Sequence, residues 1–355
     1  MKKKRYTASL IGTGRIGFTL GFDKKREQPA SHTMALLKNK RIQLIAACDS
    51  DATKLNDWKR FCPRAQTYAN YGHLFAAKTS DIIVIAVNEN AHLESCIAAI
   101  RAKPRLIILE KPVALSMREG LQIADEAKKN NVPILVNHER RFALDYKIAK
   151  SYLNTIGNLQ SIRGELFSRM PVFSKEKKET GEYSLLHDGT HLIDIVHYFL
   201  ENEKEIESEE KNFKQILFDM KIMDAHRDEK NSVRNLNVHF ASEKCSDVSI
   251  LINGCANYFG FGVDIIGSDG RIVIGNGYAR FYKTEESKLY ENFFSLSRDE
   301  TIRVPQKTKY FSRMVQSAID FLDGKILLNS SLHDALRTLD VIEQIILELE
   351  SQSSQ

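Results

Sequence analysis

The clearest chemical pattern lies near the N-terminus, where a short apolar run is followed by Gly12-Thr13-Gly14-Arg15-Ile16-Gly17. In a G-x-G-x-x-G loop, the first glycine permits a tight turn, the second lets the backbone approach a pyrophosphate, and the third lets a helix pack closely. We expect that helix to begin near Ile16, so that its N-terminal N–H groups and its dipole face the anion. The pattern predicts dinucleotide binding.

A carboxylate, Asp49, follows the second apolar run, where dinucleotide-binding folds carry an acidic side chain that accepts hydrogen bonds from the adenosine ribose. Asp49 lies 32 residues beyond Gly17, more than the usual spacing of about 20. We attribute the excess to a polar insertion over residues 23–32. A carboxylate here repels a 2′-phosphate, so NAD is favoured over NADP. Alternatively, Asp49 is the N-cap of the next helix.

A lysine follows the fourth apolar run, in Leu109-Glu110-Lys111-Pro112. The carboxyl ends of the strands in an open α/β sheet form the edge at which ligands bind, so Lys111 is placed to touch a substrate. Pro112 restricts the backbone immediately after it. The same residues are also compatible with a solvated turn at the end of a strand.

Three histidines and two aspartates lie within residues 187–197. In one continuous helix, His187, His191 and Asp194 share a stripe because they stand at i, i+4 and i+7. A histidine oriented by a carboxylate can act as a general acid or base near neutral pH. One core histidine and one surface histidine would give the same spacing.

The same run resembles a degenerate H-E-x-x-H zinc site, with His187 and His191 as ligands and Asp188 in place of the glutamate base. Aspartate is one methylene shorter than glutamate, and Gly189 costs about 1 kcal/mol inside a helix. A zinc hydrolase would also leave the glycine loop without a role. We therefore expect no metal site, and the zinc hydrolase remains an alternative.

The elements that must position these residues differ between the two halves of the chain. Up to about residue 145, near-continuous apolar runs alternate with amphipathic stretches, which predicts a parallel sheet covered by helices. We expect strands at 7–11, 42–48, 82–87, 106–109 and 134–137, with helices beginning near Ile16, Asp51, Ala91 and Ser116.

The second half alternates more strictly, which predicts a mainly antiparallel sheet. We expect strands at 159–169, 233–241, 246–253 and 260–266, a tight turn at 268–270, and helices at 310–322 and 332–349. The charged segment 201–211 reads as an exposed loop or a solvated helix face.

Composition limits the classes of protein. The 355 residues are enough for about two domains. The five cysteines lack C-x-x-C spacing, as is usual for reduced cytoplasmic thiols. The net charge is +5, and no apolar run reaches the roughly 18 residues of a membrane span. We expect a cytoplasmic protein that binds neither nucleic acid nor membrane.

The ordered set of motifs resembles the glucose-fructose oxidoreductase / inositol dehydrogenase (Gfo/Idh/MocA) family. It comprises the glycine loop, Asp49, the strand before His92, Glu110-Lys111-Pro112, and His191-x-x-Asp194. The resemblance extends through Arg141-Phe142 to the two final helices. It implies an α/β fold with a doubly wound Rossmann domain, residues 1–145. A second α+β domain, residues 146–355, would carry a large open sheet through which homodimers or homotetramers form.

The resemblance also implies roles for individual residues. NAD would contact the glycine loop and a second group of residues, namely Asp49, Val87, Asn88, His92, Glu110 and Lys111. Lys111 would touch both the nicotinamide and the substrate hydroxyl, and His191 would exchange a proton with that hydroxyl. Asp194 and Arg141 would bind substrate hydroxyls, or Asp194 would orient His191. The substrate would be a sugar, a cyclitol or a nucleotide-linked sugar.

Two departures from the family pattern affect these roles. His187 stands where family dehydrogenases often carry aspartate, so either His187 takes over a substrate contact or Asp188 reaches in. Val87-Asn88-Glu89 replaces a Thr-Pro-Asn-like loop before His92, and we expect the cofactor geometry to survive with altered contacts. A non-catalytic nucleotide-binding sensor on the same fold is a further hypothesis, opposed by the presence of both Lys111 and His191.

Overall fold

The computed structural model describes residues 4–77, 79–201 and 215–352. The chain forms two compact units, one of residues 1–143 and 307–336 and the other of residues 144–306 and 337–355. The expected boundary at 145/146 lies close to the observed division at 143/144. Residues 202–211 of the charged segment fall outside the described residues, and Glu201 is buried.

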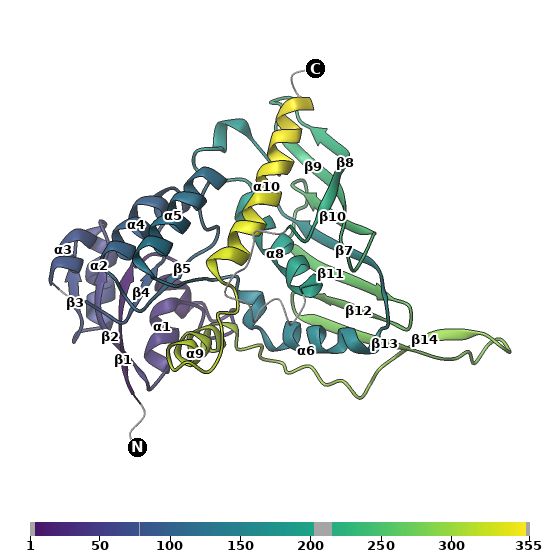
Figure 1. The fold of residues 1–355 in the computed structure, drawn as a ribbon, viewed down its shortest axis with the longest axis horizontal. Helices are drawn as coiled ribbons and strands as arrows, with labels where there is room; N and C mark the ends of the chain where they lie inside the picture. The colour runs from purple at the N-terminus through teal and green to yellow at the C-terminus, as the bar shows by residue number, and fades with distance from the viewer. Residues whose placement is uncertain (1–3, 78, 202–214, 353–355) are drawn as a thin grey trace. The chain divides into compact units, whose positions relative to one another are not determined.

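The first unit is built on a six-stranded parallel sheet with the strand order β3-β2-β1-β4-β5-β6 (Figure 1). This is the order of a Rossmann fold. The strands are β1 (Tyr6–Ile11), β2 (Ile42–Cys48), β3 (Gln66–Tyr68), β4 (Ile82–Ile85), β5 (Leu106–Leu109) and β6 (Ile134–Val136). The five expected strands are confirmed to within two residues, whereas β3 is too short and polar to stand out in the sequence.

Helices of the first unit are α1 (His32–Lys38), α2 (Ala52–Phe61), α3 (Tyr71–Ala77), α4 (His92–Arg101), α5 (Met117–Asn130) and α9 (Tyr310–Leu322). The expected starts at Asp51, Ala91 and Ser116 are confirmed, and the Asp51 and Ser116 side chains cap α2 and α5. The expected helix start near Ile16 is wrong. A turn and the 3-10 helix η1 (Thr19–Phe22) follow the glycine loop, and Gly17 and Gly21 weaken helix formation there.

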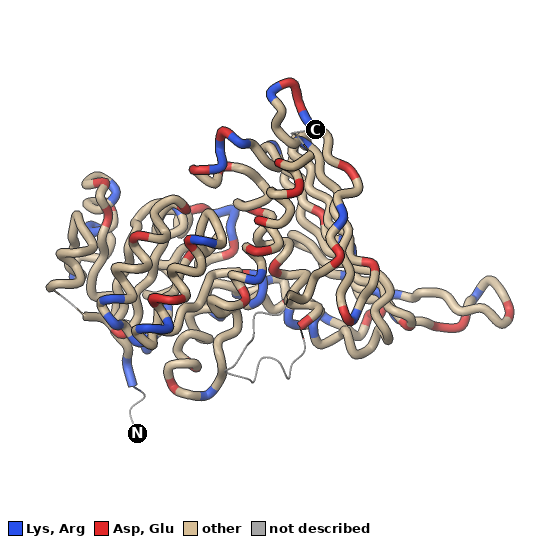
Figure 2. Tube along the Cα trace, turned by 45° about the horizontal axis from the view of Figure 1, so that its top comes forward, with Lys and Arg blue, Asp and Glu red and all other residues tan. Residues whose placement is uncertain are grey.

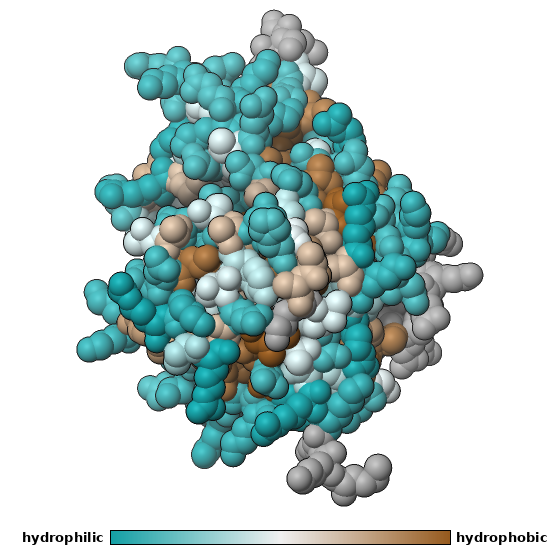
Figure 3. Space-filling model, turned by 90° about the vertical axis from the view of Figure 1, so that its left-hand side faces the viewer, coloured by the Kyte–Doolittle hydropathy of each residue, from teal (hydrophilic) through white to brown (hydrophobic). Residues whose placement is uncertain are grey.

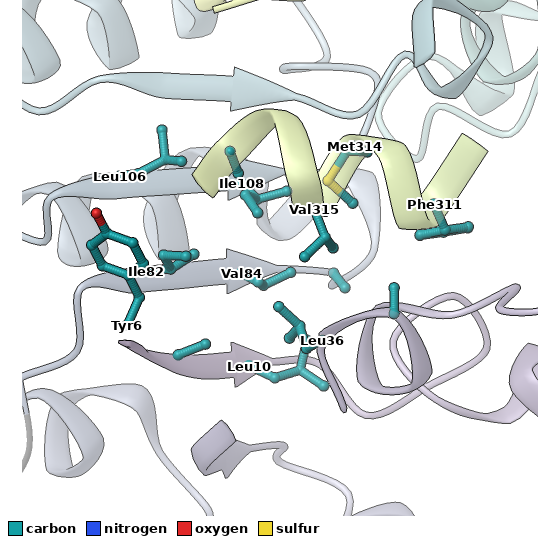
Figure 4. Close-up of a cluster of buried hydrophobic side chains, with 14 of the residues drawn as sticks. Tyr6, Leu10, Leu36, Ile82, Val84, Leu106, Ile108, Phe311, Met314 and Val315 are labelled. Carbon is teal, nitrogen blue, oxygen red and sulfur yellow. The ribbon is translucent and has the colours of Figure 1, made fainter. Parts of the chain in front are cut away.

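The core of the first unit includes α9, although α9 lies more than 160 residues beyond β6 in sequence. Figure 4 shows Phe311, Met314 and Val315 of α9 over side chains of the sheet such as Val84 and Ile108. The helix at 310–322 is confirmed, but its packing contradicts the expectation that both final helices belong with the second domain. Its apolar face lies on the parallel sheet and completes that core.

The second unit is built on an eight-stranded sheet with the order β14-β13-β12-β11-β7-β10-β9-β8. Among the described strands of this second sheet, only β7 and β10 pair in parallel, so the expected mainly antiparallel sheet is confirmed. Its strands are β7 (Leu159–Phe167), β8 (Phe218–Arg227), β9 (Val233–Ala241), β10 (Val248–Asn253), β11 (Gly260–Gly267), β12 (Gly270–Gly275), β13 (Tyr278–Glu286) and β14 (Phe294–Arg298).

Helices α6 (Leu144–Tyr152), α7 (Ser184–His187), α8 (Gly189–Leu200) and α10 (Leu332–Gln352) also belong to this half of the chain, and α10 begins within the first unit. The expected helix at 332–349 is confirmed. Residues of β10 alternate strictly between buried and half-exposed. This alternation indicates a sheet with one covered face and one open face.

Positive and negative side chains are interspersed along the chain (Figure 2). The face shown in Figure 3 is mainly hydrophilic, with smaller hydrophobic patches between hydrophilic residues. Among the described residues, no helix combines the length and the apolar character needed to cross a membrane.

Candidate functional site: a dinucleotide edge and a histidine helix

The glycine loop follows β1 and is fixed by close backbone contacts. Gly12 has φ +92°, and a Cβ there would lie 2.3 Å from the Ala86 carbonyl oxygen. A Cβ on Gly17 would lie 2.1 Å from the Gly12 oxygen, whereas a Cβ on Gly14 would meet no atom within 4 Å. Space is therefore left open only at the glycine whose backbone a pyrophosphate would approach.

Helix α1 contacts the glycine loop through hydrogen bonds to its carbonyls, whereas the expected helix would begin near Ile16 and direct its N-terminus at the anion. Its first backbone N–H groups, of His32 and Thr33, donate to the carbonyls of Ile16 and Gly17 at 3.0 Å each. The Thr33 hydroxyl also donates to the Gly17 oxygen at 2.7 Å. These N–H and hydroxyl groups of α1 are used in hydrogen bonds to the loop carbonyls. An anion at the loop would therefore contact the loop backbone and the exposed Arg15 rather than the N-terminus of α1.

Asp49 follows β2 and is bound directly to the glycine loop. One carboxylate oxygen accepts from the Thr13 backbone N–H at 2.7 Å and from the Thr13 hydroxyl at 2.9 Å, and the other accepts from the Asp51 N–H at 2.9 Å. The alternative that Asp49 caps the next helix is wrong, because Asp51 caps α2. A carboxylate offers about four acceptor positions, so these three donors leave capacity for a ribose hydroxyl.

His92 joins the ends of β4 and β5. Its side chain is fully buried, with Nδ1 2.7 Å from the Pro112 carbonyl oxygen and Nε2 3.3 Å from the Val87 carbonyl oxygen. Burial lowers the pKa of His92, although both carbonyls oppose the shift. The neighbouring Asn88 is exposed. His92 thus holds the loop at residues 87–88, and the cofactor contacts of Val87, Asn88 and His92 remain predictions.

Glu110 ends β5 immediately before the half-buried Lys111. One Glu110 oxygen accepts from His32 Nε2 at 2.6 Å and from Asn137 Nδ2 at 2.8 Å, and the other accepts from the Lys111 backbone N–H at 3.3 Å. Burial by itself raises the pKa of this carboxyl. The donors and the nearby positive charges outweigh burial, so the pKa lies below its usual value.

Further cationic side chains lie near the ends of β5 and β6. Burial lowers the pKa of His138 strongly, and the positive charges of Arg141 and Lys111 lower it further. The Arg141 side chain, expected to bind substrate, is buried at 1% exposure. Its neighbour Arg140, which was not predicted as a site residue, has a side chain that is 12% exposed. The Arg141 contact remains a prediction.

The histidine cluster of the second unit is divided between two helices. His187 is the last residue of α7, and Asp188 separates it from α8, which contains His191 and Asp194. The expected continuous helix is therefore interrupted at Asp188, while His191 and Asp194 remain three residues apart on one helix. Gly189 favours this break, because glycine weakens a helix interior.

Burial in the cluster follows this division. His187 and Asp188 are half-buried, whereas His191 is 8% exposed and Asp194 is 1% exposed. Over the ranges that the structure describes, no three His, Cys, Asp or Glu side chains are grouped as metal ligands. The single helix on which the two-histidine zinc spacing depends is interrupted at Asp188.

Three residues that support these positions were missed in the sequence. They are His32 and Asn137 beside Glu110, and Lys150 in the second unit. Lys150 Nζ donates to the carbonyls of Tyr198, Phe199 and Glu201, and so caps the C-terminus of α8. The position of Asn137 at the end of a predicted strand could have indicated it. His32 lies in the segment that was read as an insertion.

The six-stranded sheet with its glycine loop defines a dinucleotide-binding Rossmann domain, and comparison with known proteins identifies its family. Residues 7–138 match the family described as "Oxidoreductase family, NAD-binding Rossmann fold", GFO_IDH_MocA. The expected resemblance to the Gfo/Idh/MocA oxidoreductases is confirmed over residues 7–138 of this chain.

Relatives with assigned names match parts of the chain. Inositol 2-dehydrogenase of Salmonella paratyphi B is 21% identical over 201 residues, which cover 55% of each chain. Glucose-6-phosphate 3-dehydrogenase of Bacillus subtilis is 25% identical over 274 residues, which cover 71% of this chain and 73% of the relative. The match thus spans little more than half of the inositol dehydrogenase.

The fold itself is shared over nearly the whole chain. The structure of the WlbA dehydrogenase from Chromobacterium violaceum, in complex with NADH and UDP-GlcNAcA, superposes with a TM-score of 0.73 at 15% identity. The superposition covers 99% of this chain and 96% of that one. The two-unit architecture expected from the sequence is therefore confirmed.

Proposed function

We propose that the chain is an NAD-dependent dehydrogenase that oxidises a CH–OH group, or reduces the matching ketone, of a sugar-like substrate. The observation that carries the proposal is the arrangement at one edge of the first unit's sheet. There the open backbone at Gly14, the Asp49 carboxylate and Lys111 follow β1, β2 and β5. The carboxyl ends of parallel strands form the ligand-binding edge of such a sheet.

NAD, when bound, supplies the acceptor for the hydride. Oxidation of CH–OH removes the carbon-bound hydrogen as a hydride and the oxygen-bound hydrogen as a proton, leaving C=O. We assign the proton to His191, with Asp194 on the same helix to orient its ring or to bind a second hydroxyl. The Lys111 ammonium would donate to the substrate oxygen and stabilise its developing negative charge.

Asp49 supports the choice of NAD over NADP. Its carboxylate is fixed against the glycine loop by both donors of Thr13, so a 2′-phosphate on the ribose would meet a negative charge that cannot easily turn away. The substrate is a polyhydroxylated ring. The relatives act, by their names, on an inositol and a sugar phosphate, and WlbA was crystallised with a nucleotide sugar.

The functional unit is a homodimer or homotetramer formed through the open sheet of the second unit. Large apolar side chains are exposed there, and the hairpin between β13 and β14 projects beyond the sheet (Figure 1). The exposed large apolar side chains of this hairpin are Leu289, Tyr290, Phe293, Phe294 and Leu296. Apolar patches of this kind mark association surfaces. Light scattering after gel filtration tests the assembly, and a monomer at every concentration would contradict it.

The deciding experiment is a screen of NAD and NADP reduction over cyclitols, sugars, sugar phosphates and nucleotide sugars, followed by Lys111→Ala on any substrate found. We expect Lys111→Ala to lower kcat by about 10²- to 10⁴-fold while NADH still quenches or enhances fluorescence on binding. Lys128→Ala, an exposed lysine on α5, is the matched control. Binding of NADH without turnover of any substrate would favour the sensor instead.

A further inference from the structure

The segment between the glycine loop and β2 contributes a buried histidine to the edge that holds Lys111. His32 is fully buried at the first position of α1. Its backbone N–H donates to Ile16 of the glycine loop at 3.0 Å, and its Nε2 lies 2.6 Å from a Glu110 oxygen. His32 therefore connects the glycine loop to the end of β5.

Glu110 transmits this contact to the lysine. The Glu110 backbone N–H donates to the Ile85 carbonyl at 3.0 Å, so the residue is anchored to β4. Its second oxygen accepts from the Lys111 N–H. Since a carboxylate can only accept hydrogen bonds, His32 Nε2 must donate. The ring of Phe311 packs edge-on against the His32 ring at 5.1 Å, which restricts the ring to this position.

We propose that His32 is a positioning residue for Lys111: it holds the Glu110 carboxylate ionised and fixed, and the carboxylate in turn fixes the backbone from which the lysine projects. The inference rests on the proposed function for its kinetic consequence. The ionisation state of the Glu110 carboxyl can be measured whether or not the protein has the proposed activity.

Four ionisable groups from the elements around Glu110 interact with it electrostatically. They are His32 on α1, His92 on α4, Glu139 in the 3-10 helix after β6 (Glu139–Phe142), and the adjacent Lys111. Removal of the His32 donor leaves a buried carboxylate with fewer partners, and burial then favours the protonated form. Protonated Glu110 would no longer hold Lys111 in the same way.

The kinetic test compares His32→Leu, which removes the donor, with His32→Gln, whose side-chain nitrogen can occupy the position of Nε2. We expect His32→Leu to lower kcat by about ten- to a hundredfold, equivalent to one hydrogen bond to a charged group. As the pH is lowered, the activity of His32→Leu should begin to fall at a higher pH than that of the wild type, because Glu110 becomes protonated earlier. The affinity for NADH should change little. His32→Gln should restore most of the loss.

The matched control is Tyr6→Phe, which removes the hydrogen bond from Tyr6 to Asp323 at the opposite, amino end of β1. A merely structural role for His32 predicts that Leu, Gln and the control all lower the melting temperature without altering the pH profile. That outcome, or equal kinetic defects in the Leu and Gln variants, would overturn the inference.

Infrared spectroscopy separates this inference from the proposed function. In His32→Leu, the carbonyl band of a protonated carboxylic acid should appear at a pH at least about one unit higher than in the wild type. The band should vanish in the double variant His32→Leu/Glu110→Gln. Its absence from His32→Leu overturns the inference even if the enzyme is active, and its presence supports the inference even if no substrate is found.

Discussion

The edge of the first unit's sheet and the α7–α8 segment of the second unit hold their polar residues by different means. At the sheet edge, Asp49 and His92 bind backbone groups of other segments, and Glu110 binds the side chains of His32 and Asn137. In α8, all twelve residues are buried, and Lys150 secures the C-terminal end. The first region is positioned by directed hydrogen bonds and the second mainly by apolar packing.

This difference determines how substitutions should act in the two regions. A side chain held by directed hydrogen bonds can be altered with a local effect, because its neighbours keep their own partners. A residue in a fully buried helix affects packing as well as chemistry. Each region is therefore best tested with a pair of variants: one that should change activity, binding or stability, and a nearby one that should not.

The largest effect is expected in the histidine helix. His191→Ala should lower kcat by about 10²- to 10⁴-fold if His191 handles the proton. His187→Ala should have an effect at least about tenfold smaller, because Asp188 separates His187 from the helix that contains His191 and Asp194. Steady-state kinetics with the same substrate measure both. Equal losses would restore the continuous-stripe interpretation.

At the glycine loop, Gly12→Ala and Gly14→Ala should separate stability from binding. Gly12→Ala should lower the free energy of unfolding by at least about 2 kcal/mol, because of its positive φ and the clash with Ala86. Gly14→Ala should leave it within about 0.5 kcal/mol but weaken NADH binding about tenfold. Urea unfolding measures the free energy of unfolding, and fluorescence titration measures NADH binding. Equal destabilisation by both variants would contradict the loop geometry.

Asp49→Asn should shift the cofactor preference by about tenfold towards NADP, since it removes the charge that opposes the 2′-phosphate. The matched control is Asp51→Asn, which alters the exposed N-cap of α2 two residues away. The measured quantity is the ratio of kcat/KM for NAD and NADP. An unchanged ratio in Asp49→Asn would show that another group selects the cofactor.

The smallest effect concerns an ion cluster at the amino end of the sheet. Hydrogen bonds from Arg41, Lys325 and Tyr6 hold the pKa of Asp323 well below its usual value. A lowered pKa stabilises the fold above the ordinary aspartate range, and this contribution is lost as the pH falls through the lowered value. Asp323→Asn should thus be less stable than the wild type at pH 7, with the difference narrowing towards pH 3 in urea titrations.

Local sequence signals predicted most elements of the first unit but only four of the eight described strands of the second, namely β7, β9, β10 and β11. Most strands of the first unit are near-continuous apolar runs, and the N-caps Asp51 and Ser116 precede their helices, so the sequence predicts these boundaries directly. β3 and η1 were missed because short polar or glycine-flanked segments form only where neighbours support them. The break between His187 and His191 was missed because hydrophobic periodicity continues across Asp188.

By itself, the sequence determined the two-unit α/β architecture, the glycine loop and the residues that could do chemistry, because periodicity, turn residues and motif spacing are local properties. The tertiary structure alone decided that α9 completes the core of the first unit. It also decided that Asp49 binds Thr13 and that His32 reaches Glu110. Each of these contacts joins residues far apart in the chain, so only the packing of the folded protein brings them together.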